Sequence, residues 1–322
     1  MTLRSAAAFA VLLVACLVPP SGAVAQGLPA WAPINPMAAS RSPLEFEPFR
    51  PPREGWSANL ALDYASAIEF GAEAHASYDL DAEILRLRLR LARDLSPSAF
   101  VELDGGIGGS YAGFLDGFLD WYHGLLGIEL KERERRPHNS FLYRLELPRG
   151  PAVEREPSDI YLGDLRVAAG WRYTDRVQTV ASIWLPTSTA PDGYSLGVVA
   201  GALVTTLHAT IAKPLVFEGS VGAGYAPTHG DLAEYQHTTF ISASSGLRWR
   251  FWGRQSLYAN LFVHTPYYHD TTIRALDRRD MALDFGWILA TRSGREWRLG
   301  LTEDLEPGGP GIDLVFRLGV SR

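Results

Sequence analysis

The stretch LRLRLRL at residues 85–91 places leucine and arginine in strict alternation. Successive side chains of a β-strand point to opposite faces of the sheet, so a strand here carries leucine on one face and arginine on the other. A helix would distribute both kinds of side chain around its circumference. The stretch therefore predicts a strand between an apolar and a polar surface, as found in a soluble sandwich and in a transmembrane barrel.

The same alternation recurs along most of the chain and decides between these two folds. One face is almost wholly apolar, and the other is polar or small. Most of these stretches are longer than the roughly 5–6 residues of globular strands and suit a tilted bilayer crossing. We expect strands near 56–70, 82–94, 97–108, 159–173, 176–187, 195–210, 214–227, 236–251, 255–267, 279–292, 295–304 and 310–320. The prediction is an all-β fold, a 12-stranded antiparallel transmembrane β-barrel.

The connections between these strands alternate in length. The links at 95–96, 174–175, 211–213, 252–254 and 293–294 are tight, and the links between them are long. Outer-membrane barrels have short periplasmic turns and longer external loops, so both ends of the barrel are expected in the periplasm. Residues 141–147 also alternate, but a thirteenth crossing would invert every later loop. We interpret them as an external ribbon within a long loop at 109–158.

Aromatic residues lie near both sets of connections, as the two aromatic girdles of a barrel would. Those expected in the periplasmic girdle are Trp171, Tyr173, Trp249, Phe251, Trp252 and Trp297. Those expected in the outer girdle are Tyr225, Tyr267 and Tyr268.

Residues 1–25 have the composition of a secretory signal peptide, with Arg4 before an apolar run and a small-x-small cleavage site ending at Ala25. A lipoprotein box ending at Cys16 is the alternative. Residues 26–54 form a proline-rich segment that cannot be a central strand. They are either a periplasmic tether or an extended segment folded into the lumen. Residues 55–322 form the barrel.

Alternation places a set of charged side chains on the inner face of the barrel. Arginine suits such a lumen because its planar fork binds carboxylates through two hydrogen bonds. The expected lumen-lining residues are Asp63, Arg86, Arg88, Arg90, Arg166, Arg172, Arg248, Arg250, Asp284, Arg298, Asp313 and Arg317.

The sequence YAGFLDGFLDWYHGLLG at 111–127 predicts a short helix in the long loop. Asp116, Asp120 and His123 fall on one stripe of this helix. Two carboxylates and an imidazole could bind a metal or act as acid and base, but an amphipathic lid is the favoured interpretation. We expect the helix to pack over or into the barrel mouth, with these three residues turned toward the lumen arginines or a solute.

Two further features admit a functional interpretation. The run at 131–136 alternates arginine or lysine with glutamate, which indicates a solvated loop or a contact with lipopolysaccharide phosphates. His264 is expected to point inward, where a hydrogen-bonded core histidine is the common case. A Ser/His esterase site would need a serine within reach, and Ser256 on the same strand lies eight residues away.

Several motifs together resemble an uncharacterised proteobacterial family, the domain of unknown function 3187. They are GFLDGFLDWYHGLLG at 113–127, GDLRVAAGWRY at 163–173, LPT at 185–187, and the closing LTEDLEPG and DLVFRLGV. The resemblance runs from about residue 30 to the C-terminus. It implies an outer-membrane barrel and brings no substrate, cofactor or catalytic residue with it. The succession of Gly163-Asp164, a strand, and then Leu185-Pro186-Thr187 is also similar to the pattern of barrels that transport hydrophobic compounds.

The expected function is a narrow channel for small solutes, hydrophobic ones among them, in the outer membrane of a Gram-negative bacterium. A membrane-embedded lipid hydrolase and a plugged structural or surface-binding barrel are the alternatives. The chain has 30 basic and 36 acidic residues, which gives no support to nucleic-acid binding. The expected partners are outer-membrane lipid, lipopolysaccharide and the barrel-assembly machinery. No cofactor, metal ion or catalytic residue is expected.

Overall fold

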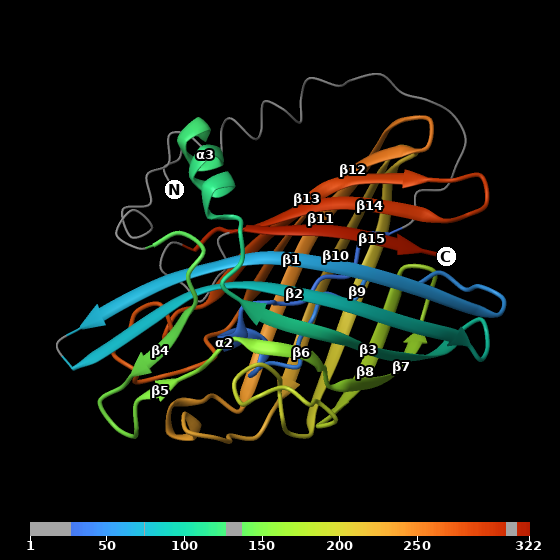
Figure 1. Ribbon diagram of the computed structural model, residues 1–322. Coiled ribbons are helices and arrows are strands. Elements are labelled where there is room, and N and C mark those ends of the chain that lie inside the picture. The colour runs from blue at the N-terminus through green and yellow to red at the C-terminus, as the bar shows by residue number, and fades with distance from the viewer. Residues whose placement is uncertain (1–26, 74, 127–136, 307–313) are drawn as a thin grey trace.

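The computed structural model describes residues 27–73, 75–126, 137–306 and 314–322. Within these residues, twelve antiparallel strands close into a barrel, because β1 pairs with both β2 and β15 (Figure 1). The predicted fold is confirmed. In barrel order the strands are β1 (Trp56–Glu73), β2 (Ala76–Asp94), β3 (Ala99–Tyr111), β7 (Leu165–Arg172), β8 (Val177–Leu185), β9 (Ala200–Ala212), β10 (Leu215–Tyr225), β11 (Thr239–Trp252), β12 (Gln255–His264), β13 (Asp280–Ala290), β14 (Glu296–Asp304) and β15 (Leu314–Ser321).

The remaining elements belong to the external connections or to the N-terminal segment. They are α2 (Pro36–Ala39), α3 (Asp116–Leu126), β4 (Leu142–Glu146), β5 (Val153–Glu154), β6 (Ser158–Leu162) and the 3-10 turn η1 (Ala233–Tyr235). β4 pairs with the outer end of β2, from Ser77 to Asp81, and does not cross the barrel wall. The external ribbon predicted at 141–147 is therefore confirmed.

The two largest differences from the predicted strand boundaries lie in the first hairpin and at Asp164. The first long link, expected at 71–81, is instead a continuation of β1 and β2, which stay paired as far as Glu73 and Ala76. This hairpin extension is stable because its inner side chains, such as Tyr78 and Leu80, are buried against β4 and the external loops. The strand expected at 159–173 is divided into β6 and β7 at Asp164, whose carboxylate accepts backbone N–H groups from the loop after β8.

The outer surface of the barrel is apolar, as the alternation predicts. Large hydrophobic side chains on this surface are 40–62% exposed; examples are Leu60, Leu89, Leu103, Ile183, Leu203, Val221, Ile241, Leu299 and Leu318. Aromatic residues beside the tight turns, such as Trp171 and Trp252, are exposed as well. Among the described residues, no helix is long and apolar enough to cross a bilayer.

The external mouth of the barrel is closed by a tyrosine-rich cap. This cap is a hydrophobic core formed by the β1–β2 extension, β4, the external loops and the N-terminal segment. Tyr267 and Tyr268 are 0% and 2% exposed and belong to the cap, so their predicted place in the outer girdle is wrong. The reason is that the loop after β12 folds inward over the lumen. The other tyrosines fully or nearly buried in the cap are Tyr78, Tyr143, Tyr194 and Tyr235.

A lumen site built from arginines and the N-terminal segment

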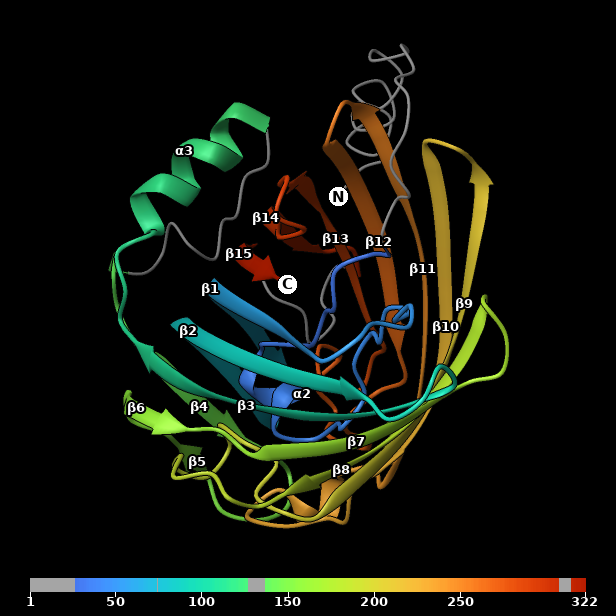
Figure 2. The same ribbon diagram turned by 90° about the vertical axis from the view of Figure 1, so that its right-hand side faces the viewer.

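Residues 27–53 fill the lumen, and we call them the plug (Figure 2). The plug enters at the end of the barrel with the tight turns, where Arg248 of β11 contacts the carbonyl of Gly27. It turns at α2 beneath the tyrosine-rich cap and returns toward β1. A backbone bridge between Trp31 and Phe46 joins its two arms. Of the two interpretations of the proline-rich segment, the structure supports the lumen segment.

The sequence of the plug explains why it turns where it does. Asn35 accepts a hydrogen bond from the backbone N–H of Met37 at 2.9 Å, and Pro36 occupies the first turn of α2. Asparagine is a favoured N-cap, and proline is pre-organised for a first helical turn. Met37 at the tip is fully buried, and the hydroxyl of Tyr268 donates to its carbonyl at 3.1 Å.

The arginines of the wall satisfy the backbone of the plug. Proline has no N–H, so a proline-rich chain cannot join a sheet and leaves carbonyls that need donors. Arg86 donates to the carbonyls of Ala32, at 2.9 Å, and of Pro33. Gln178 of β8 donates to the carbonyl of Pro48 and accepts from the N–H of Arg50, both at 2.8 Å. Side chains of the wall thus make the hydrogen bonds to the plug backbone that a neighbouring strand would otherwise make.

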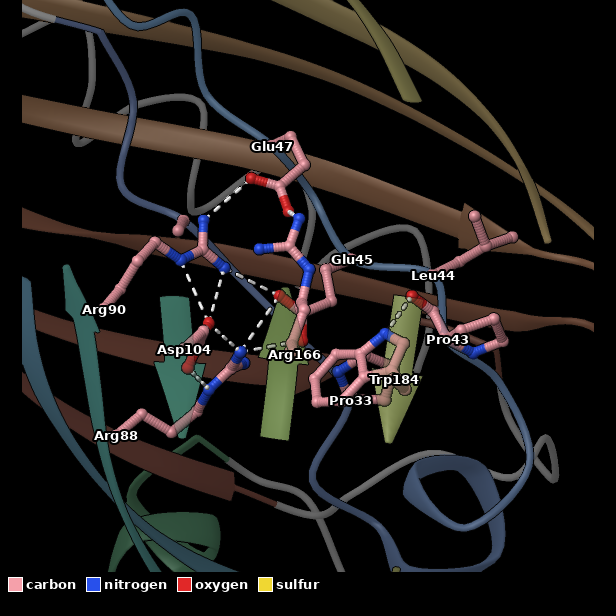
Figure 3. Close-up of polar contacts among 12 residues, drawn as sticks. Pro33, Pro43, Leu44, Glu45, Glu47, Arg88, Arg90, Asp104, Arg166 and Trp184 are labelled. Carbon is pink, nitrogen blue, oxygen red and sulfur yellow. Dashed lines mark hydrogen bonds and ion pairs between the residues drawn. The ribbon is translucent and has the colours of Figure 1, made fainter. Parts of the chain in front are cut away.

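Glu45 of the plug is held by two arginines of β2 (Figure 3). Its carboxylate lies 2.9 Å from Arg88 Nη2 and 2.8 Å from Arg90 Nη2. Asp104 of β3 accepts from both arginines on the wall side, with 3.0 Å to Arg90 Nε. Arg88 also lies over the ring of Trp184, 5.8 Å from its centroid. Glu45 therefore neutralises the positive charge that Arg88 and Arg90 retain after pairing with Asp104.

Glu47 lies two residues further along the plug and is also held by two arginines. Arg90 Nη1 donates to Glu47 Oε2 at 2.7 Å, and Arg166 Nη2 of β7 donates to Glu47 Oε1. The other side of Arg166 faces Glu102 of β3 at 3.3 Å. Residues 45 and 47 point the same way because side chains in extended chain repeat every two residues. We call Arg88, Arg90 and Arg166 the arginine cluster.

The arginine cluster is largely buried, although the side chains of Arg90 and Arg88 are still 12% and 17% exposed. The side chain of Arg166 is 1% exposed, that of Glu47 4% and that of Glu45 6%. Removing charges from water is costly, and only close pairing with hydrogen bonds offsets this cost. Loss of one partner would leave an uncompensated buried charge, so these contacts fix the position of the plug.

Two cavities lie on either side of the arginine cluster. One, of about 110 Å³, is toward the external loops and is lined by Glu45, Arg88, Trp184 and Tyr194, among others. The other, of about 130 Å³, is toward the tight turns and is lined by Glu47, Arg90, Arg298 and the C-terminal residues of the chain. The plug and the arginine cluster separate them.

The other lumen-lining candidates form smaller groups. Asp63 lies 2.8 Å from Arg86 and 3.0 Å from Arg317, and Arg317 also reaches Asp284 at 3.3 Å. The structure thus joins predicted residues from β1, β2, β13 and β15 in one network. Asp313 lies outside the described residues.

The remaining predicted arginines lie nearer the tight turns. Each has its own contact, and these contacts do not merge into one site. Arg172 pairs with Asp94 at 3.0 Å, Arg248 with Glu296 at 2.7 Å, Arg298 with Asn59 at 2.7 Å, and Arg250 with the carbonyl of Lys213 at 3.4 Å.

The predicted helix exists as α3, but its expected position over the mouth is wrong. The helix lies outside the barrel (Figure 2). Leu115 and Leu119 pack on the outer wall with Leu314 of β15 and the outward-facing Tyr64 and Phe316. The reason is that the helix has an apolar side that matches the apolar outer wall better than a charged lumen.

The polar stripe of α3 does not meet the lumen arginines. Asp116 accepts the backbone N–H of Asn139 at 2.5 Å, and Asp120 pairs with His138 at 3.1 Å. The side chain of His123 lies outside the described residues, as does the whole basic run at 131–136. Among the described residues, no group of three or more histidine, cysteine or acidic side chains could hold a metal ion.

His264 is buried and hydrogen-bonded, but its partner is not on its own strand. Its Nε2 lies 2.6 Å from Ser42 Oγ of the plug, and its Nδ1 contacts the carbonyl of Thr265. Ser42 also accepts from the N–H of Leu44. Ser42 is 8% exposed and His264 0% exposed, so both are enclosed in the lumen. The pair therefore attaches the plug to the wall and does not face a lipid substrate.

Glu45, Glu47 and Ser42 are not among the site residues that the sequence predicts. One signal was present: the inner face of β2 carries three arginines in succession, and neutralising them needs acidic partners from elsewhere. The acidic pair in the stretch EFE at 45–47 has the spacing of one strand face. Only the fold shows that the two stretches lie together.

A closed barrel with an apolar outer wall, a charged lumen and an internal plug defines a protein of the outer-membrane barrel class. The chain belongs to the family described as "Protein of unknown function (DUF3187)", whose model matches residues 21–321. No curated protein sequence matches it significantly.

An outer-membrane channel is among the solved structures with a similar fold. The COG4313 outer membrane channel from Pseudomonas putida F1 aligns with a TM-score of 0.54 and 13% identity, over 84% of this chain and 96% of that one. A FadL homologue from Pseudomonas aeruginosa aligns with a TM-score of 0.40 and 10% identity, over 83% of this chain and 90% of that one. At these identities the likeness concerns the fold.

Proposed function

We propose that this protein is an outer-membrane channel for small polar solutes whose resting state is closed by its own plug. One observation carries the proposal: one lumen cavity is lined by Glu45 and Arg88 and another by Glu47 and Arg90, so the plug and the arginine cluster lie between them. A barrel made only for structure has no need of solvent-sized space on both sides of a barrier. The charged lining favours polar solutes over hydrophobic ones.

The attachment of the plug supports a movable barrier. The described part of the plug is held by side-chain contacts, and its one backbone bridge joins its own two arms. Both arms reach the end of the barrel with the tight turns, which we assign to the periplasm. The plug can therefore withdraw without breaking any strand pair of the wall.

The test combines an opening variant with a disulfide that holds the plug. The double variant Glu45→Gln/Glu47→Gln removes both carboxylates from the arginine cluster and should raise the open probability in planar bilayers. A loss of about 1.4 kcal/mol from the closed state raises the open-to-closed ratio about tenfold. The matched control is Glu54→Gln, because Glu54 is exposed at the end of the same segment.

The disulfide pairs Leu44→Cys with Gly224→Cys. A Cβ atom at Gly224 would lie 2.9 Å from Cγ of Leu44, which suits a bridge between plug and β10. Added to the opening variant, the pair should abolish conductance under oxidising conditions, and a reductant should restore it. If the opening variant folds but stays silent, or conducts equally with the bridge formed, the proposal is wrong and a permanently plugged structural barrel is the better interpretation.

A further inference from the structure

The two plug glutamates occupy an anion site that belongs to the barrel wall. The arginine cluster supplies three positive charges, and the neighbouring wall carboxylates of Asp104 and Glu102 supply two negative ones. The wall alone therefore leaves one positive charge at this level, and Glu45 and Glu47 reverse it to one negative charge. A withdrawn plug would uncover a site with spare guanidinium donors.

The geometry of the donors specifies the chemistry of a ligand. Each glutamate accepts hydrogen bonds from two guanidinium groups. Arg90 donates to both glutamates, through Nη2 to Glu45 and through Nη1 to Glu47. Guanidinium forks bind carboxylates with charge-assisted, directional hydrogen bonds. Two carboxylates that share one guanidinium must belong to a short molecule. A single carboxylate would satisfy only half of the site.

The position of the site gives a solute access to it. Arg88 lines the cavity on the side of the external loops, and Arg90 lines the cavity on the side of the tight turns. An anion in either cavity therefore meets one end of the arginine cluster without crossing the apolar wall. The glutamates of the plug hold the place that such an anion would take.

We propose that the arginine cluster is a binding site for small solutes that carry two carboxylates, and that such a solute competes with Glu45 and Glu47 of the plug. This inference rests on the proposed function, because the solute gains the site when the plug yields it. The substrate itself then favours the open state. Plug and solute are alternative ligands of the same three arginines.

Glutarate is the probe, because it is a short molecule that carries two carboxylates, with three methylene groups between them. Its affinity for the purified full chain in detergent is measured by calorimetry, with butyrate and 1,5-pentanediol at equal ionic strength as controls. We expect glutarate to bind Glu45→Gln/Glu47→Gln at least about tenfold more tightly than wild type, because the competing carboxylates are gone. Glu54→Gln should bind like wild type.

Arg90→Lys in the opening variant keeps the charge but removes the fork, and it should lose most of the gain while the barrel still folds. Equal affinity for glutarate and butyrate, or equal affinity with and without Arg90→Lys, would overturn the inference. Absence of glutarate binding to a folded opening variant would do so as well. Binding is read without current, so glutarate binding by a silent barrel would refute the channel alone, and conductance that ignores glutarate would refute the site alone.

Discussion

Two segments outside the barrel strands have opposite fates, the plug at 27–53 and the helix α3 at Asp116–Leu126. The plug is rich in proline, has a single helical turn and is almost entirely buried inside the lumen. α3 is a regular helix with abundant apolar surface, and it lies outside the barrel. The sequence predicts the helix at the mouth and leaves two positions open for the plug, in the periplasm or in the lumen.

The difference follows from what each segment offers to the surface it contacts. The plug offers backbone carbonyls and two carboxylates, which suit a lumen rich in arginine. α3 offers leucine and aromatic side chains, which suit an outer wall made of the same residue types. Regular secondary structure is no guide to burial here. Complementarity of charge and polarity decides which segment enters the barrel.

The largest expected effect comes from reversing one plug charge. Glu47→Lys would place an ammonium beside Arg90 and Arg166, and breaking a buried ion pair costs about 3–5 kcal/mol. We expect the plug to leave the lumen. Arg41 is 0% exposed in the closed state, so trypsin cleavage after Arg41 measures its release.

The matched control for the charge reversal is Glu54→Lys, which should leave Arg41 protected. If Glu47→Lys also leaves Arg41 protected in a folded barrel, then charge complementarity does not hold the plug. The comparison between the two segments would then lose its basis.

The second prediction concerns the anchor of α3 on the outer wall. Glu83 of β2 accepts the backbone N–H of Phe114 at 2.7 Å and that of Leu115, and the hydroxyl of Tyr64 also donates to it. Glu83→Gln should weaken this anchor by about 1 kcal/mol, because hydrogen bonds to an ionised carboxylate become weaker bonds to a neutral amide. Hydrogen exchange of the amides at 114–126 should become faster.

Conductance is the discriminating measurement for the Glu83→Gln variant. Because α3 lies on the outer wall, conductance and Arg41 protection should stay as in wild type. A rise in conductance on loosening α3 would restore the lid interpretation that the structure replaces. Glu73→Gln, at the exposed tip of the same hairpin, is the control.

These cases show what the sequence could and could not predict. The twelve crossings follow from an alternation of apolar and polar side chains with a period of two residues. This is a local property, and residues 85–91 display it most clearly. The division at Asp164 and the extension to Glu73 depend on loops that pack against them, so local pattern could not predict either.

The site depends on contacts between distant parts of the chain. Glu45 and Arg88 are 43 residues apart, and Glu47 and Arg166 are 119 apart. Alternation identified the arginines because they lie on strands. It could not identify the glutamates, because the plug belongs to no sheet of the barrel and the spacing of Glu45 and Glu47 does not indicate which wall residues they meet.

A third and smaller effect is expected from pH. Arg41 contacts His229 of the external loop after β10 at 3.2 Å, and burial followed by the charge of Arg41 lowers the pKa of His229 from 6.5. The open state takes up the proton more readily, so the closed state loses stability as the pH falls through and below 6.5.

The measurement for His229 is the temperature at which Arg41 becomes cleavable after brief heating at pH 7.5 or pH 5.5. Acid should lower this temperature in wild type and lower it less in His229→Gln. The same decrease in both proteins would assign the pH effect to other groups, such as His237, whose pKa burial also lowers.

The smallest effect on stability is expected on the exposed side of α3. Here the informative measurement is whether lipid or water surrounds the side chains. Trp121 and Leu125 are 62% and 69% exposed and lie four residues apart, so they project from one side of α3; Phe114, just before the helix, is 68% exposed. An apolar side of this size is unfavourable in water, so we expect it to lie in lipid. Trp121→Cys should change stability by no more than about 0.5 kcal/mol.

A nitroxide attached at Trp121→Cys reports which solvent surrounds this side of α3. The control is Asp120→Cys, one residue away and roughly 100° around the helix, where the native side chain is 40% exposed and pairs with His138. In bilayers the label at 121 should be relaxed more by oxygen, which concentrates in lipid, and the label at 120 more by a water-soluble nickel complex. Equal relaxation by the nickel complex would place both sides of α3 in water. The comparison would then stand for the plug alone, and the apolar side of the helix would need another partner.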